Sequence, residues 1–176
     1  MELLLTRHGE TDWNRENRVL GRTNAPLNER GQAQALALVR ALEGVRLQAV
    51  YASPLARALA VGRLVADAHG LVCRTDERLI EMDFGAMEGR RRDDPAYLAE
   101  KRRLFARYPG GESYFQAAAR VYPFLEELKE RHGDETVLVV THNGICRVIA
   151  NYFEDMSEED FVGFAMKNCE VRRFRA

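Results

Sequence analysis

Short apolar runs recur along the chain, and polar or helix-patterned segments separate them. Four runs have the length of buried strands, and a fifth near the end of the chain fits an edge strand. These predicted strands are Glu2–Thr6, Ala49–Ala52, Leu71–Arg74, Thr136–Val140 and Glu170–Phe174. Strands that alternate with helices are typical of an α/β domain with a largely parallel sheet.

The segments between the strands carry helical spacing or helix-start signals. Predicted helices cover Gly31–Leu42, Ser53 to about His69, Pro95–Arg107, Ser113–Arg131 and Gly144–Phe153. In the first of these, Ala35, Leu36 and Val39 share one face. Ser53-Pro54 should start the second, because serine is a favoured N-cap and proline fits a first helical turn. Residues 85–131 carry little strand signal and are expected to form a helical insertion over the sheet.

Length and composition are those of one ordinary globular domain. The 176 residues suffice for a single core, so we expect one domain over residues 1–176, built as a three-layer sandwich of helices around the sheet. A net charge of −1 gives no general attraction to nucleic acid or to an anionic membrane. The three cysteines form no CxxC pair, and no apolar run could span a bilayer. We expect a reduced, cytoplasmic protein, either a monomer or a homodimer.

Two of the apolar runs end in the same way. Residues 2–10 read ELLLTRHGE and residues 137–144 read VLVVTHNG. In open α/β sheets, ligands bind just beyond the carboxyl ends of the strands. Arg7, His8 and His142 should therefore meet at that edge.

A second arginine and two helix starts belong to the same edge. Arg57 follows the second strand in the first turn of a predicted helix, and further helix N-termini at Ser53 and Asn143 would add free N–H donors. Two histidines, two arginines and these donors form a crevice that attracts anions, and phosphate is the obvious ligand.

The tripeptide Arg-His-Gly occurs a second time in the chain, in a different context. Arg131-His132-Gly133 repeats it at the end of a long helical pattern, where it is typical of a helix C-terminus. His69-Gly70 has the same interpretation. Only the position of His8 and His142 after apolar strands sets them apart.

Other phosphate or metal chemistries lack their signatures. His8, Asp12, Glu81 and His142 could in principle bind a dication, but no HxxxH, HxH or DxD spacing occurs, and Arg7 and Arg57 would repel a cation. The sequence has no P-loop, no cysteine-phosphatase loop and no GxSxG serine. We therefore expect neither a metal nor a cofactor.

Several motifs in a fixed order resemble the histidine phosphatase superfamily, which includes the cofactor-dependent phosphoglycerate mutases. They cover nearly the whole chain. They are Arg7-His8-Gly9-Glu10-Thr11 with Trp13-Asn14, Leu27 with Gly31 and Gln34, Ser53-Pro54-Leu55-Ala56-Arg57-Ala58, Glu81-Met82-Asp83-Phe84-Gly85 with Glu88-Gly89, Gly110-Gly111-Glu112-Ser113 and Thr141-His142-Asn143-Gly144.

The resemblance implies a phosphoglycerate mutase-like fold and a role for each site residue. His8 would be the nucleophile and Glu81 the proton donor. Arg7, Arg57 and His142 would hold the phosphoryl oxygens. The remaining phosphate- or substrate-binding positions would be Asn14, Gly21, Thr23 and Asn143.

The implied activity is hydrolysis of a small phosphorylated metabolite through a phosphohistidine, as in α-ribazole-phosphate phosphatases or broad-specificity enzymes. A phosphoglycerate mutase is the alternative, and a non-catalytic phospho-ligand-binding module is the second. The short insertion favours hydrolysis, because a mutase must keep water from its phosphohistidine. Leu20 also argues against the glycolytic mutase. The runs Arg90–Arg92 and Lys101–Arg103 could contact a second acidic group, although such runs are more often solvated surface.

Overall fold

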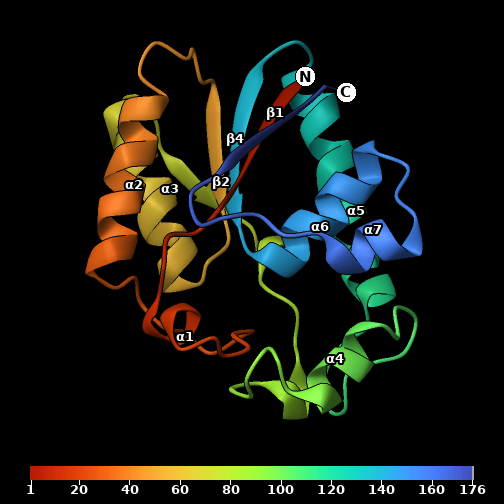
Figure 1. The fold of residues 1–176 in the computed structure, drawn as a ribbon. Coiled ribbons are helices and arrows are strands. Elements are labelled where there is room, and N and C mark those ends of the chain that lie inside the picture. Colours follow the sequence, from red (N-terminus) through yellow and green to blue (C-terminus); the bar gives the residue numbers. More distant parts are fainter. Residues whose placement is uncertain (176) are drawn as a thin grey trace.

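The computed structural model describes residues 1–175, and its centre is a five-stranded sheet (Figure 1). The strands are β1 (Glu2–Arg7), β2 (Ala49–Ala52), β3 (Cys73–Thr75), β4 (Thr136–Thr141) and β5 (Val171–Arg175). Their order is β3-β2-β4-β1-β5; the first four are parallel, and β5 runs antiparallel to β1 at the edge. The predicted mostly parallel sheet with a C-terminal edge strand is confirmed.

Helices cover both faces of this sheet. The helices are α1 (Asp12–Arg15), α2 (Glu29–Ala41), α3 (Ala56–Ala68), α4 (Pro95–Lys101), α5 (Tyr114–His132), α6 (Asn143–Phe153) and α7 (Glu158–Gly163). Figure 1 shows α2 and α3 on one face and α5 and α6 on the other, which confirms the three-layer sandwich. Among residues 1–175, no helix is long and apolar enough to cross a membrane.

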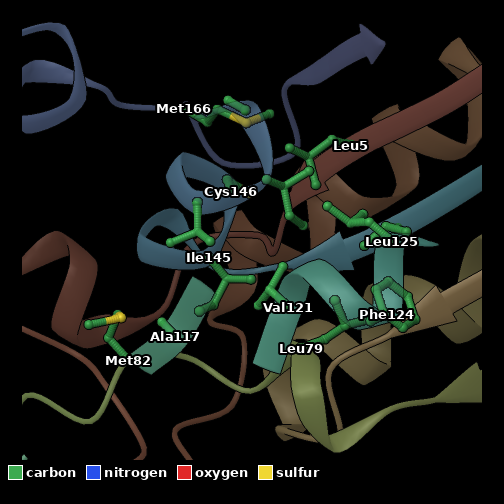
Figure 2. Close-up of a cluster of buried hydrophobic side chains, with 14 of the residues drawn as sticks. Leu5, Leu79, Met82, Ala117, Val121, Phe124, Leu125, Ile145, Cys146 and Met166 are labelled. Atoms are coloured by element: carbon green, nitrogen blue, oxygen red, sulfur yellow. The ribbon is translucent and has the colours of Figure 1, made fainter. Parts of the chain in front are cut away.

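The central strands are apolar at every position because both of their faces are buried. In β1, Leu3 and Leu5 belong to the core beneath α5 and α6, whereas Leu4 belongs to the core beneath α2 and α3. β4 alternates in the same way. Figure 2 shows the first core, in which Leu5 lies among Val121 and Phe124 of α5 and residues of α6.

Two local predictions on the α2 and α3 side were wrong. Leu36 is 49% exposed, because the buried face of α2 consists of Gly31, Ala35 and Leu38. Ser53 does not cap a helix: α3 begins later, with Leu55 as its N-cap and no side-chain cap bond. The Ser53 hydroxyl is instead bonded to His142, so it serves the sheet edge rather than the helix.

The segment expected as an insertion has two parts that lie differently. α5 packs on the sheet as one of its covering layers, with Ser113 as N-cap. α4 ends at Lys101, earlier than predicted, and lies beyond the end of the sheet opposite the two termini (Figure 1). The short α1 and α7 were not predicted, although Thr11 and Asn14 form a capping box that marks the start of α1.

Candidate active site

His8 follows β1 directly and is held in one orientation. Its ring is 3% exposed, and Nδ1 lies 2.6 Å from the carbonyl oxygen of Gly9. Because a carbonyl only accepts, Nδ1 carries the proton and Nε2 keeps an unprotonated lone pair. Burial, and then the charges of Arg57 and Arg7, lower the pKa of His8 well below 6.5. His8 is therefore neutral and nucleophilic at neutral pH.

Arg57 lies in the first turn of α3, as predicted, and faces His8. Its Nε donates to His8 Nε2 at 3.3 Å, while its two terminal nitrogens donate to the carbonyl oxygens of Gly21 and Thr23 at 2.6 and 2.8 Å. The side chain is fully buried and has no carboxylate partner at bonding distance among residues 1–175. Burial lowers the pKa of Arg57 to about 10, so it remains charged at neutral pH.

Arg7 and His142 complete a cationic and polar wall around His8. Arg7 is the last residue of β1, and one of its nitrogens donates to the Met166 carbonyl oxygen at 2.9 Å. The His142 ring lies 5.2 Å from the His8 ring, centroid to centroid. His142 Nε2 bonds Ser53 Oγ at 2.7 Å, whereas its buried Nδ1 and the buried Nε of Arg7 have no hydrogen-bond partner within residues 1–175.

Glu81 is the carboxylate of this site. A glutamate in a loop is often exposed, but Glu81 is buried. It is 4% exposed. Its two oxygens accept from the backbone N–H groups of Met82 at 2.8 Å and Gly144 at 3.2 Å. Burial raises the pKa of Glu81 above 4.5, against the opposing effect of these two bonds and of Arg57. Such a carboxyl retains a proton to a higher pH than usual, as a general acid must.

The structure places the other predicted residues around these groups. Gly21 and Thr23 hold Arg57 through their carbonyl oxygens, and their N–H groups donate to Glu88. Asn14 has a buried Nδ2 without a partner among the described residues. Asn143 accepts from the Met166 N–H through its Oδ1. Direct contact of these four residues with a substrate remains a prediction.

Asp12 does not join the site, since it is exposed and pairs with Arg15 at 3.0 Å. Within residues 1–175, no three His, Cys, Asp or Glu side chains gather as metal ligands would. His132 lies in the last turn of α5 with Gly133 as its C-cap, as predicted, but the ring is buried. His69 is the C-cap of α3.

Comparison with known proteins agrees with this geometry. The sequence profile of the Histidine phosphatase superfamily (branch 1) matches residues 3–176. The chain belongs to the histidine phosphatase superfamily.

Two curated proteins and one solved structure illustrate its relatives. Phosphoserine phosphatase 1 of Hydrogenobacter thermophilus is 34% identical over 81% of this chain and 71% of its own length. A probable phosphoglycerate mutase of Salmonella choleraesuis is 32% identical over 98% of this chain and 84% of its own. The mycobacterial glucosyl-3-phosphoglycerate phosphatase superposes with a TM-score of 0.88 at 27% identity, covering 98% and 88% of the two chains.

Two residues of this histidine phosphatase were missed as parts of the site. The sequence predicts Ser53 as a helix cap, but its hydroxyl is hydrogen-bonded to His142. Arg120 of α5 donates to the carbonyl oxygen of Arg78, at 2.5 Å, and to Glu112 at 2.7 Å. It thereby anchors the loop that carries Glu81. No motif marks either role, because both depend on contacts between segments far apart in sequence.

Proposed function

We propose that this histidine phosphatase hydrolyses a small phosphorylated metabolite through a phosphohistidine on His8. The observation that carries the proposal is the orientation of His8. Its Nδ1 proton is bound to Gly9, so Nε2 carries the lone pair, which accepts a hydrogen bond from Arg57 Nε until a phosphoryl group takes its place. The buried Glu81, close enough to Arg57 and Arg7 for their charges to oppose the burial that raises its pKa, supplies the acid.

The first step forms the phosphoenzyme. His8 Nε2 attacks phosphorus, the P–O bond to the alcohol breaks, and the Glu81 proton goes to the leaving oxygen. Arg7 and Arg57 neutralise the charge that develops on the phosphoryl oxygens. The Nε of Arg57 faces His8, and the buried Nε of Arg7 has no partner among residues 1–175. His142 adds its unpartnered Nδ1.

The second step returns the enzyme to its initial state. Ionised Glu81 takes a proton from water, the water oxygen attacks phosphorus, and the P–N bond to His8 breaks with release of inorganic phosphate. Glu81 is then protonated and His8 is again neutral. Both steps use the same carboxyl in opposite protonation states, which its raised pKa favours.

Hydrolysis is proposed rather than mutase activity because the segment beyond the strand ends, residues 76–113, is short. Between β3 and α5 the described chain forms one short helix, α4 (Figure 1), and two 3-10 turns, η1 (Glu77–Leu79) and η2 (Gly85–Met87). A mutase has to exclude water from its phosphohistidine, whereas a phosphatase has to admit it. A broad-specificity enzyme fits this arrangement. An α-ribazole-phosphate phosphatase, whose alcohol carries no second anion, is an alternative, and so is transfer to a second phosphoester.

Rapid quenching of a reaction with ³²P-labelled substrate tests the proposal. We expect an alkali-stable, acid-labile label on the wild-type protein and none on His8→Ala. Release of labelled phosphate should be independent of added 2,3-bisphosphoglycerate. A label that passes to a second phosphoester instead of water would establish a mutase, and turnover without any labelled protein would contradict the phosphohistidine.

A further inference from the structure

A second cationic space adjoins the acid of the phosphoryl site. A cavity of about 220 Å³ is lined by Glu81 on one side and by residues of α4, α5 and α6 on the others. At about 30 Å³ per water, it would hold on the order of seven waters, so a skeleton of a few carbons with one polar end group fits. We call it the leaving-group pocket. Because Glu81 protonates the leaving oxygen, this pocket lies on the alcohol side of the scissile bond.

Arg147 of α6 forms the buried wall of the leaving-group pocket. It is 2% exposed. One terminal nitrogen donates to the Tyr114 hydroxyl at 2.6 Å and the other to the Phe164 carbonyl oxygen at 2.9 Å. Its Nε has no partner among residues 1–175, and no carboxylate in that range forms an ion pair with it. A buried guanidinium with neutral partners and a spare donor retains most of its capacity to bind an anion.

Two further cations line the same pocket, Arg92 and Lys101. Neither forms an ion pair within the described part of the chain. Burial, then the charges of Arg147 and Arg92, lower the pKa of Lys101 to about 8. Three positive charges therefore repel one another here, and Glu81 is the lone carboxylate among the residues that line the pocket.

The neighbours of these cations in sequence show that the arrangement is selective. Arg91 pairs with Asp93 at 2.8 Å, and Arg103 pairs with Glu100 at 3.0 Å, both on the surface. Arg90 pairs with Asp94. In the run Arg90–Arg92, the residue that lines the pocket is the one without a carboxylate partner among residues 1–175. In the second run Lys101 lines the pocket, whereas Arg102, which also forms no ion pair in that range, does not. The two runs are thus partly solvated surface and partly pocket wall.

We propose that the leaving-group pocket binds an anionic group, a carboxylate or a second phosphate, on the alcohol portion of the substrate, with Arg147, Arg92 and Lys101 as its recognition groups. The inference rests on the proposed function, because it takes Glu81 as the acid that faces the alcohol. Three cations favour an anion over a hydroxyl, the more so because Arg147 is buried. Tyr97 and Tyr114 supply flat walls for the carbon skeleton between the two anions.

Matched substrate pairs test the anion and distinguish its two forms. 3-Phosphoglycerate and glycerol 3-phosphate differ by a carboxylate in place of a hydroxymethyl group. The bisphosphate and monophosphate of 1,3-propanediol differ by a second phosphate. We expect the anionic member of at least one pair to have a kcat/KM about 10- to 100-fold higher, the range for a hydrogen bond to a charged group. The favoured pair identifies the form of the anion.

Lys101→Met removes one recognition charge, and Arg103→Met is its matched surface control. Lys101→Met should raise KM for the anionic member about tenfold more than KM for the member without the second anion. Arg103→Met should leave the ratio of the two KM values unchanged. Lys101→Gln repeats the test with a polar side chain should the methionine variant fold poorly. Calorimetry on the His8→Ala variant gives the binding affinity of each member of a pair, and therefore the same comparison without turnover.

The two proposals fail in different ways. Equal affinities within both pairs on His8→Ala, or equal effects of Lys101→Met and Arg103→Met, would overturn the anionic leaving group. Hydrolysis of p-nitrophenyl phosphate that persists in His8→Ala would instead overturn the phosphohistidine. In that case the binding affinities within each pair would still show whether the leaving-group pocket prefers an anion.

Discussion

The same tripeptide occurs twice in this protein and has two unrelated uses. Arg7-His8-Gly9 lies at the carboxyl end of β1, where His8 faces a second histidine and Arg57. Arg131-His132-Gly133 lies at the end of α5, where Gly133 takes a positive φ of 43° and ends the helix. The difference shows that the strand before the tripeptide, and not the tripeptide itself, indicates a histidine of the candidate site.

His132 is nevertheless not a surface residue. It is 7% exposed; Nε2 bonds the Tyr51 hydroxyl at 3.0 Å and Nδ1 bonds Glu135 at 2.7 Å. A hydroxyl from the β2 segment therefore holds this histidine, as Ser53 holds His142. Both nitrogens of His132 are occupied, whereas His8 and His142 each keep one nitrogen for the site.

Removal of His8 should have the largest effect on activity. His8→Ala takes away the nucleophile, and kcat should fall by at least about 10⁴-fold. The residue lies in a loop at the strand end, so circular dichroism and cooperative unfolding should show an intact fold. A variant that keeps a tenth of wild-type kcat would place the nucleophile elsewhere.

Replacement of Glu81 should separate substrates by their leaving groups. Glu81→Gln keeps the shape of the side chain but removes the proton, so alkyl phosphates should slow by roughly 10²–10⁴-fold. p-Nitrophenyl phosphate should slow far less, because nitrophenolate leaves without a proton. Steady-state rates on both esters measure the effect. Equal losses on the two would assign Glu81 to binding or to the second step.

The pH dependence should report the shifted pKa values of the same two residues. His8 is active when neutral and its pKa is lowered, so activity should be lost only as the pH falls well below 6.5. Glu81 is active as an acid and its pKa is raised, so kcat/KM for an alkyl phosphate should fall as the pH rises through that value. The alkaline decline should be absent for p-nitrophenyl phosphate. A decline of the same size with both esters would assign it to another group.

Removal of His132 should affect stability and hardly affect turnover. His132→Ala deletes two hydrogen bonds of a buried ring, so the free energy of unfolding should fall by about 1–3 kcal/mol. kcat should stay within about twofold, since Tyr51 and Glu135 are not part of the site. Denaturant unfolding and steady-state assays check the two values. A stable variant with tenfold lower kcat would show that the second tripeptide also contributes to turnover.

The sequence predicted the cluster of His8, Arg57 and His142 better than its surroundings. His8, Arg57 and His142 were found because each follows a buried strand whose apolar pattern is unmistakable. Ser53 was misplaced because a serine before a proline is also a common helix start. Arg147 gave no signal at all, since an arginine in an amphipathic helix is ordinary until the fold buries it.

The basic runs show why the rest could not be predicted. Arg91 and Arg92 are adjacent in sequence, yet one pairs with Asp93 at the surface and the other lines the leaving-group pocket. The side to which each arginine turns depends on where the segment after η2 (Gly85–Met87) is held against the rest of the chain. That placement depends on contacts such as Arg92 to the Arg18 carbonyl oxygen, which join distant segments. Local pattern contains no information on such contacts.

The position of β4 between β2 and β1 has a consequence for synthesis of the protein on the ribosome. Glu2 pairs with Thr136, and β2 has β4 as its neighbour on that side, so β1 and β2 cannot join into one sheet before residues 136–141 emerge. Contacts this far apart in sequence also form slowly. The nascent chain therefore carries His8 and Arg57 for most of its translation without a phosphoryl site, and catalytic competence arises in one late event.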